Sequence, residues 1–430
     1  MGADRQGERR QGGRLRPRRQ DLEPARRPPA WRAAVAALFF LFVVPALCFW
    51  GAVTWASSVL GAMALVIVWF LLMLAAAPRL RSLSLLLFTV SVGLLAAELL
   101  LRSDLMNRYV EERDLTQFRR GLVTTLEPLI VPDPALAYRL SPDRKARATA
   151  VKDGRTIYDV TYTTDGHGFR ALPPDGKPAG DVPVLILGDS FAFGSGLPDD
   201  ETLAWYLREE SGAKLQPVNL AVKGYGIHQV LRQLEIGEPR RSGHQRFPWA
   251  VLSIVDDHVL RVAGRVQWLH DSPRYVVEPD GALVARGTWV HPSDFVESLI
   301  VGSRLFALAW KAFEVDEPGE RRLFVRILRE IEARLAADYG ARLVVLYYAG
   351  ETWRGDLAGW RNTMVPLLCE AAVPVLDVNA LLPRPPQPAD RFYIADDGHP
   401  TALLNRTIAA ALIEDFRRGT VERGSLRCAR

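Results

Sequence analysis

In the second half of the chain, short apolar runs alternate with longer segments whose apolar residues share one helical face. The runs predict β-strands. The longer segments predict amphipathic helices, as where Leu323, Ile327 and Ile331 recur along one face. The predicted strands are residues 184–187, 215–220, 249–255, 343–348 and 373–378. This alternation indicates an α/β fold with a mostly parallel sheet and helices on both faces.

Two other patterns lie outside this alternation. Residues 275–285 contain Pro279-Asp280-Gly281 and predict an inserted β hairpin, followed by an apolar helix at 296–313. Residues 156–162 alternate polar and apolar after an Asp153-Gly154 turn, which predicts a small hairpin. We therefore expect a junction at residues 103–180 with a helix and this hairpin, a main domain at 181–419 and a C-terminal tail at 420–430.

Three long apolar stretches occupy residues 33–50, 59–77 and 83–101. Each is close to the roughly 20 residues that cross a bilayer, so residues 33–102 predict three transmembrane helices. A buried helical bundle is the alternative, but three consecutive long apolar runs, in which Glu98 is the one charged residue, disfavour it. A signal peptide has a single, shorter apolar region and a cleavage site, which fits poorly.

The positive charge of the chain is concentrated at its start. Residues 1–32 hold ten Arg and four acidic residues, so this tail carries +6 of a chain whose net charge is +5. The tail has few apolar residues and is expected to be disordered. The rest is close to neutral, which argues against nucleic-acid binding. Arginine placement puts the tail in the cytoplasm and the domain after Arg102 in a bacterial periplasm, anchored in the inner membrane.

Three cysteines define neither a disulfide framework nor a metal site. Cys48 lies inside an apolar run, so at most Cys369 and Cys428 can pair. We expect no cofactor and no resident metal ion.

Polar or glycine residues follow the predicted strands. Ser190 follows the first strand, Gly224 the second and Asp256 the third, while Asp396 and His399 lie beyond the last. The carboxyl ends of parallel strands meet at one edge of a sheet, so these residues are expected to converge. Serine, histidine and aspartate supply a nucleophile, a base and an orienting carboxylate. Asp396 is expected to reach the far ring nitrogen of His399, and the amides of Ser190 and Gly224 to stabilise an oxyanion.

Three short blocks carry a family resemblance. They are Gly188-Asp189-Ser190, residues 219–224 (NLAVKG) and residues 396–400 (DDGHP). In this order the chain resembles the SGNH (GDSL-type) hydrolases over roughly 181–419. The resemblance implies a flavodoxin-like α/β fold, action on small O-acyl esters, and the roles given above to Ser190, Gly224 and His399.

One block departs from the family pattern. The family has G-x-N-D where this chain has Ile254-Val255-Asp256-Asp257, so the asparagine that completes the oxyanion hole is replaced by Asp256. A carboxylate repels an oxyanion, whereas a protonated Asp256 would donate to it. Other donors, with His258 or Tyr225 as candidates, are an alternative. A slow or specialised enzyme, or a domain that binds without catalysis, remains open. A metal site at residues 256–258 is a further alternative.

The sequence therefore predicts a membrane-anchored ester hydrolase or O-acyltransferase. The expected substrate is an acyl ester of a cell-surface carbohydrate, because the domain is expected in the periplasm. The main rival is a glycan-binding or assembly domain without full catalytic function. A scaffold that partners a membrane acyltransferase is a third hypothesis.

Overall fold

The computed structural model describes residues 78–103, 122–178, 180–269, 271–289, 317–350, 358–383 and 391–421, with a few residues between 63 and 74 and three near the C-terminus. The chain divides into two compact units, residues 1–99 with 301–303 and residues 100–300 with 304–430. Each unit is described separately.

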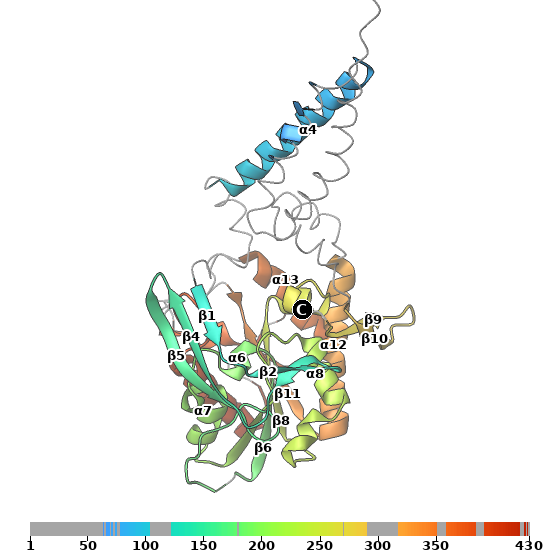
Figure 1. The fold of residues 1–430 in the computed structure, drawn as a ribbon. Coiled ribbons are helices and arrows are strands. Elements are labelled where there is room, and N and C mark those ends of the chain that lie inside the picture. Colours follow the sequence, from blue (N-terminus) through green and yellow to red (C-terminus); the bar gives the residue numbers. More distant parts are fainter. Residues whose placement is uncertain are drawn as a thin grey trace, which may run out of the picture. The chain divides into compact units, whose positions relative to one another are not determined.

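The described part of the first unit is mainly helix α4 (Pro78–Arg102), which contains the third predicted apolar stretch (Figure 1). Within the residues that the structure covers, no helix has both the length and the apolar character that crossing a membrane requires. The tail at 1–32, the stretch at 33–50 and most of 59–77 lie outside the described residues.

A five-stranded parallel sheet forms the centre of the second unit. Its strands are β6 (Val182–Leu187), β7 (Leu215–Asn219), β8 (Trp249–Val255), β11 (Arg342–Tyr348) and β12 (Val375–Asp377). Their order in the sheet is β12-β11-β8-β6-β7, and every neighbouring pair is parallel. The five predicted strands and the parallel sheet are confirmed. The order is that of flavodoxin-like folds, whose ligands bind where the direction of winding reverses, here between β6 and β8.

Successive residues of each central strand enter two different cores. Val184 and Ile186 of β6 face one core, and Leu185 and Leu187 face the other. All seven residues of β8 are buried, which explains its nearly continuous apolar sequence. Helices α7 (Leu203–Glu210) and α14 (Ala402–Arg418) cover the first face, and α8 (Ile227–Glu235), α12 (Glu317–Tyr339) and α13 (Ala358–Ala371) cover the second (Figure 1).

The junction contains more strand than the sequence predicts. Its antiparallel sheet has the order β1-β4-β5, and a second hairpin pairs β2 with β3. The predicted hairpin is confirmed as β4 and β5, with its turn at Asp153-Gly154. Buried Ala146, Ala148 and Tyr162 join the same core as β6, so the junction packs against the main sheet. The bounds are β1 (Leu122–Leu126), β2 (Ile130–Asp133), β3 (Ala137–Leu140), β4 (Lys145–Lys152) and β5 (Arg155–Thr163).

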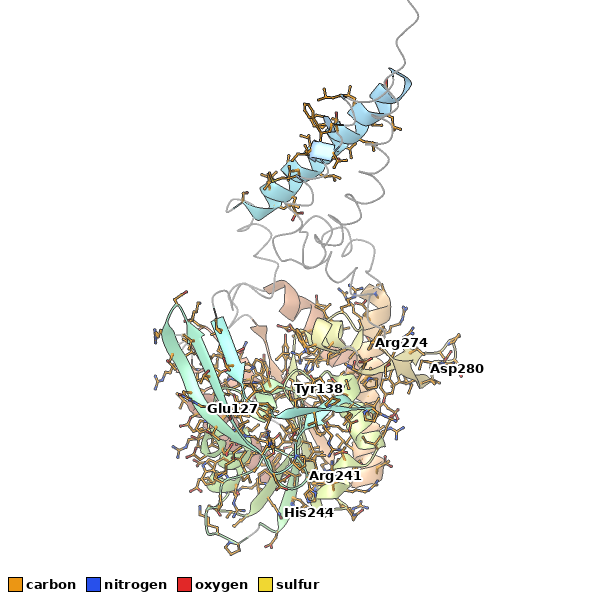
Figure 2. The ribbon with its side chains drawn as sticks, viewed as in Figure 1. Glu127, Tyr138, Arg241, His244, Arg274 and Asp280 are labelled. Atoms are coloured by element: carbon orange, nitrogen blue, oxygen red, sulfur yellow. A yellow bond between two sulfur atoms is a disulfide. The ribbon has the colours of Figure 1, made fainter. Side chains whose placement is uncertain are left out.

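The inserted hairpin is also confirmed, as β9 (Pro273–Val277) and β10 (Leu283–Thr288), with Asp280 at its tip (Figure 2). The apolar helix predicted at 296–313 lies outside the described residues. The remaining short helices are α6 (Ser190–Phe193), α9 (His258–Val262), η3 (Asp199–Glu201), η4 (Glu238–Ser242), η5 (Gln267–Leu269) and η7 (Val378–Leu381).

Asp199 and Asp200 precede helix α7 in the sequence and are of a residue type that often caps helices. Asp199 and Asp200 do not cap α7, since they lie in η3. Thr202 is the cap, and its hydroxyl accepts from the amide of Trp205 at 3.1 Å. Asp199 instead forms an ion pair of 2.8 Å with buried Arg170, a long-range partner that local sequence cannot indicate.

The end of the chain is tied to the sheet. Cys369 of α13 and Cys428 form a disulfide that closes a separation of 59 residues. Ser425 bridges Leu376, and the amide of Leu426 donates to the carbonyl of Val375 at 3.0 Å. The C-terminal segment therefore extends the edge of the sheet beside β12.

Candidate active site

The turn after β6 presents Ser190 at the carboxyl edge of the sheet. Gly188 has φ = +125°, and a Cβ at this position would lie 2.1 Å from the hydroxyl of Ser253 on β8, so only glycine fits. Asp189 caps α6, and its carboxylate accepts from the amide of Phe191 at 3.1 Å. The helix thus begins at Ser190 itself, and the nucleophile candidate is held by a short, tightly packed turn.

His399 lies within hydrogen-bond reach of this serine. Its Nε2 is 2.8 Å from Oγ of Ser190, across a sequence separation of 209 residues. Its Nδ1 is 2.5 Å from Oδ2 of Asp397. The imidazole and the carboxylate are both buried, and the ring of Phe191 packs against the imidazole with centroids 5.1 Å apart. The three side chains form a continuous serine–histidine–aspartate chain.

The orienting carboxylate is not the residue that the sequence analysis named. Asp396 does not hydrogen bond to the ring; its Oδ1 accepts from Nζ of Lys152 at 2.5 Å, and its side chain is 40% exposed. The turn explains the difference, because Asp396 and Gly398 both have positive φ and the amide of Gly398 bonds back to the carbonyl of Ile394. That geometry turns Asp396 outward and leaves Asp397 beneath His399.

The loop after β7 runs beside the Ser190 turn. The amide of Val222 donates to the carbonyl of Gly188 at 3.1 Å, which joins the two loops directly. Gly224 has φ = +83°. In the part of the chain that the structure describes, no group accepts a hydrogen bond from the amide of Ser190 or of Gly224. These two N–H groups are available to an oxyanion, as the sequence predicts.

Two aromatic side chains support the Gly224 loop from outside. The hydroxyl of Tyr138 on β3 donates to the carbonyl of Lys223 at 3.0 Å. Nε1 of Trp268 donates to the carbonyl of Gly224, also at 3.0 Å. A Cβ on Gly224 would come within 2.8 Å of the tyrosine hydroxyl, so this loop approaches its supports closely.

Asp256 does not complete the oxyanion hole. Its two carboxylate oxygens accept from the hydroxyl of Tyr347 at 2.7 Å and from the amide of Gly350 at 2.9 Å, so it organises the end of β11. The substitute donors suggested by the sequence are also engaged elsewhere. Tyr225 donates its hydroxyl to the carbonyl of Tyr138, and His258 is buried against Asp189.

Nor do residues 256–258 form a metal site. Asp256 faces β11, whereas Asp257 lies 3.8 Å from Nη2 of Arg261 and His258 faces Asp189. Among the described residues there is no group of three His, Cys, Asp or Glu side chains placed to hold a metal ion.

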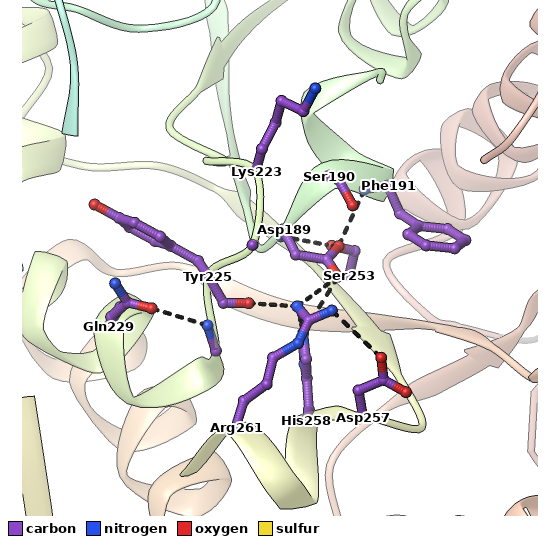
Figure 3. A network of polar contacts seen from close by, with 12 residues as sticks. Asp189, Ser190, Phe191, Lys223, Tyr225, Gln229, Ser253, Asp257, His258 and Arg261 are labelled. Carbon is purple, nitrogen blue, oxygen red and sulfur yellow. Dashed lines mark hydrogen bonds and ion pairs between the residues drawn. The ribbon is translucent and has the colours of Figure 1, made fainter. Parts of the chain in front are cut away.

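A buried ionic cluster lies beneath the Ser190 turn (Figure 3). Oδ2 of Asp189 is 2.9 Å from Nη1 of Arg261 and 3.4 Å from Nε2 of His258, while Ser253 donates to Oδ1 at 2.9 Å. Burial by itself would raise the pKa of Asp189, but the hydrogen bond with His258 and the charge of Arg261 hold that pKa below its ordinary value. Asp189 is therefore a charged carboxylate that fixes its turn.

The two histidines near this cluster are neutral. Burial, followed by the charge of Arg261, lowers the pKa of His258. Burial lowers the pKa of His228 to about 3, and its Nε2 is 3.0 Å from the hydroxyl of Ser272. Neither ring contacts Ser190, so His399 is the histidine that the fold assigns to the serine. The sequence indicated neither Arg261 nor this cluster.

Comparison with known proteins gives structural matches only. No protein-family model and no curated protein matches the chain. A lipolytic protein of the G-D-S-L family from Veillonella parvula is similar at 12% identity and a TM-score of 0.33, over 55% of this chain and 99% of its own. An acetylxylan esterase from Geobacillus stearothermophilus is similar at 12% identity and a TM-score of 0.32, over 56% and 96%. An α/β hydrolase enzyme from the metagenome of Lake Arreo is similar at 16% identity and a TM-score of 0.32, over 57% of this chain and 98% of its own.

The class that the fold and the site define is a flavodoxin-like α/β domain with a serine–histidine–aspartate chain at the carboxyl edge of its sheet. Three observations on this chain carry that assignment: the strand order, the serine after the first parallel strand, and the histidine that returns to it from the loop before α14. The likenesses to solved structures are too faint to assign an activity, which has to come from the contacts of the site.

Proposed function

We propose that this protein is a serine-dependent ester hydrolase or O-acyltransferase that acts on small O-acyl esters. The observation that carries the proposal is the chain from Ser190 Oγ through His399 to Asp397, with distances of 2.8 and 2.5 Å. A neutral serine hydroxyl is a weak nucleophile, and an adjacent imidazole that accepts its proton activates it. The amides of Ser190 and Gly224, which have no acceptor among the described residues, would supply the second requirement of acyl transfer, an oxyanion site.

The first half of the reaction forms an acyl-enzyme. Oγ of Ser190 attacks the ester carbonyl carbon while Nε2 of His399 takes the hydroxyl proton. The carbonyl oxygen becomes an oxyanion that accepts from the amides of Ser190 and Gly224. Asp397 accepts a hydrogen bond from Nδ1–H of His399 without taking the proton, and its negative charge stabilises the imidazolium. The intermediate then expels the alcohol, which receives the proton from Nε2.

The second half releases the acyl group. Water or the hydroxyl of an acceptor gives its proton to Nε2 of His399 and attacks the acyl carbon. Collapse of the second intermediate returns that proton to Oγ of Ser190. The same residues thus serve hydrolysis and transfer, and the identity of the attacking oxygen decides between them.

Labelling with a fluorophosphonate tests the nucleophile directly. The purified full-length chain should be labelled at Ser190 and should hydrolyse p-nitrophenyl acetate, while Ser190→Ala should lose both properties. In-gel fluorescence and peptide mass spectrometry measure the label. Ser195→Ala is the matched control, because Ser195 is a buried serine just after α6 and its replacement should leave labelling unchanged.

Two results would count against the proposal. Labelling that persists in Ser190→Ala would place the nucleophile elsewhere. A wild-type chain that neither reacts nor turns over, yet binds a glycan, would favour the non-catalytic glycan-binding or assembly domain. Loss of the third oxyanion donor makes that rival worth testing, since one such donor is worth roughly 3–4 kcal/mol of transition-state stabilisation.

We further propose that the domain works outside the cytoplasm of a bacterium, anchored by the N-terminal apolar stretches, on an ester of a cell-surface carbohydrate. The disulfide between Cys369 and Cys428 supports this location, because disulfides persist in oxidising compartments. A membrane acyltransferase that supplies or uses the acyl group is a partner consistent with the location.

This location predicts a thiol pattern in cells. If unfolded chains are alkylated with a maleimide–polyethylene glycol before reduction, only Cys48 should react, and all three cysteines should react after reduction. Gel mobility counts the added groups. Three reactive thiols before reduction would contradict the periplasmic assignment. Activity of a C-terminal reporter that functions only in the cytoplasm would contradict it as well.

A further inference from the structure

Arg261 joins the two loops that form the proposed site (Figure 3). It lies on α9 and is only 5% exposed. A single nitrogen, Nη1, donates to Oδ2 of Asp189 at 2.9 Å and to the carbonyl of Tyr225 at 2.7 Å. Asp189 immediately precedes Ser190, and Tyr225 immediately follows Gly224. The guanidinium therefore bridges positions one residue away from each proposed oxyanion donor.

The Asp189 end of this bridge is fixed on every side. Its Oδ1 accepts from the hydroxyl of Ser253 and from the amide of Phe191, which leaves Oδ2 to Arg261 and His258. Because Asp189 is fully buried and charged, Arg261 also supplies the main compensating charge. A movement of Arg261 would therefore move the Ser190 turn with it.

The Tyr225 end is equally confined. A Cβ on Gly226 would lie 2.9 Å from Cβ of Arg261, so the loop passes directly over this residue. Trp268 and Tyr138 hold the outer side of the same loop through the carbonyls of Gly224 and Lys223. Arg261 connects the loop to the Ser190 turn through its side chain, in addition to the backbone hydrogen bond from Val222 to Gly188.

We infer that Arg261 is a positioning residue that sets the separation between the amides of Ser190 and Gly224. The inference deepens the proposed function and rests on it for its chemical meaning. The hydrolases that the sequence resembles have a side-chain donor from the third block in addition to two amides, whereas Asp256 here accepts hydrogen bonds from Tyr347 and Gly350. With two backbone donors left, their spacing has to be held more tightly, and a buried charged bridge provides that restraint.

The expected effect of removing the bridge falls on the transition state. The oxyanion exists only after the serine has attacked, so misplaced amides raise the barrier without weakening ester binding. Arg261→Met should lower kcat for p-nitrophenyl acetate by about 100-fold and change KM by less than about threefold. Arg261→Lys, which keeps the charge, should recover part of the loss.

Hydrogen exchange gives a readout that does not depend on activity. In Arg261→Met, amides of residues 188–194 and 220–226 should exchange faster than in the wild-type full chain, as measured by mass spectrometry. Arg261→Met leaves a buried carboxylate unpaired and risks misfolding. The double variant Asp189→Asn/Arg261→Met removes both charges while an asparagine oxygen still accepts from Phe191, and it should show the same two loosened segments.

Arg208→Met is the matched control. Arg208 lies on α7, is also buried, and donates to both carboxylate oxygens of Asp175, at 2.7 and 3.0 Å. The Arg208→Met variant should keep hydrogen exchange in both segments, and kcat, near the wild-type values. Unchanged exchange in Arg261→Met and in the double variant, or a loss of activity that appears in KM, would overturn the inference. If the wild-type chain proves inactive, the proposed function fails, and exchange alone then decides whether Arg261 holds the loops.

Discussion

His399→Ala should lower kcat/KM for p-nitrophenyl acetate by roughly 10⁴-fold or more, whereas KM should change little. The imidazole is 2.8 Å from the serine hydroxyl, and no other histidine in the described part contacts that group. Without it the hydroxyl keeps its proton during attack, and a loss of 10⁴ corresponds to about 5.4 kcal/mol of barrier. Enzymes of this chemical type lose this much or more when the base is removed.

Steady-state kinetics of the purified full chain measures the effect, and added imidazole tests its origin. A small base that diffuses into the vacated space should restore part of the rate in His399→Ala and none in Ser190→Ala. His167→Ala is the control, because His167 is an exposed turn residue with no contact to the serine. A rate within tenfold of wild type in His399→Ala would show that another group takes the serine proton.

The central sheet could be predicted because its strands are buried on both faces. Each face of β6, β8 and β11 meets a different core, so no polar residue interrupts the run except where the fold uses one. Ser253 is that exception: it sits within β8 and donates to Asp189. Strands β1 to β3 were not predicted as such, because they are short, and β1 and β2 are largely exposed, so they lack a buried apolar pattern.

The convergence of the site was predictable for a topological reason. Parallel strands place the residues that come directly after them at one edge, so Ser190, Gly224 and His399 were expected together from their order alone. The structure brings Ser190 and His399 into contact and lays the Gly224 loop against the Ser190 turn. The sequence does not indicate contacts inside the domain such as the bridge made by Arg261. Its partners Tyr225 and Asp189 lie 36 and 72 residues away along the chain, and only the folded structure brings them together.

The sequence alone cannot decide whether Asp396 or Asp397 is the carboxylate that orients His399. Both precede His399 in the run Asp-Asp-Gly-His, and either spacing can reach a ring nitrogen. The backbone decides, since positive φ at Asp396 turns its side chain toward Lys152 on β4. Lys152 belongs to the junction, so the deciding contact comes from a residue 244 positions away.

The pair Asp397→Asn and Asp396→Asn therefore gives a sharp result. Asp397→Asn should lower kcat/KM by about 10³- to 10⁴-fold, because an amide can donate to Nδ1 and favour the tautomer that carries its proton on Nε2. That tautomer cannot accept the serine proton. Asp396→Asn should stay within about threefold of wild type, since it removes only a partly exposed ion pair worth about 0–1 kcal/mol, and asparagine tolerates positive φ as aspartate does.

The two variants control for each other, because they make the same chemical change at adjacent positions of one turn. Melting temperatures of both should be recorded beside the kinetics, so that a loss of folding is not mistaken for a loss of the orienting group. Raising the pH should not restore Asp397→Asn, because the defect lies in the placement of a proton on the ring rather than in its charge. If Asp396→Asn were the impaired variant and Asp397→Asn the active one, the assignment of the orienting carboxylate would be reversed, and with it the turn geometry from which it follows.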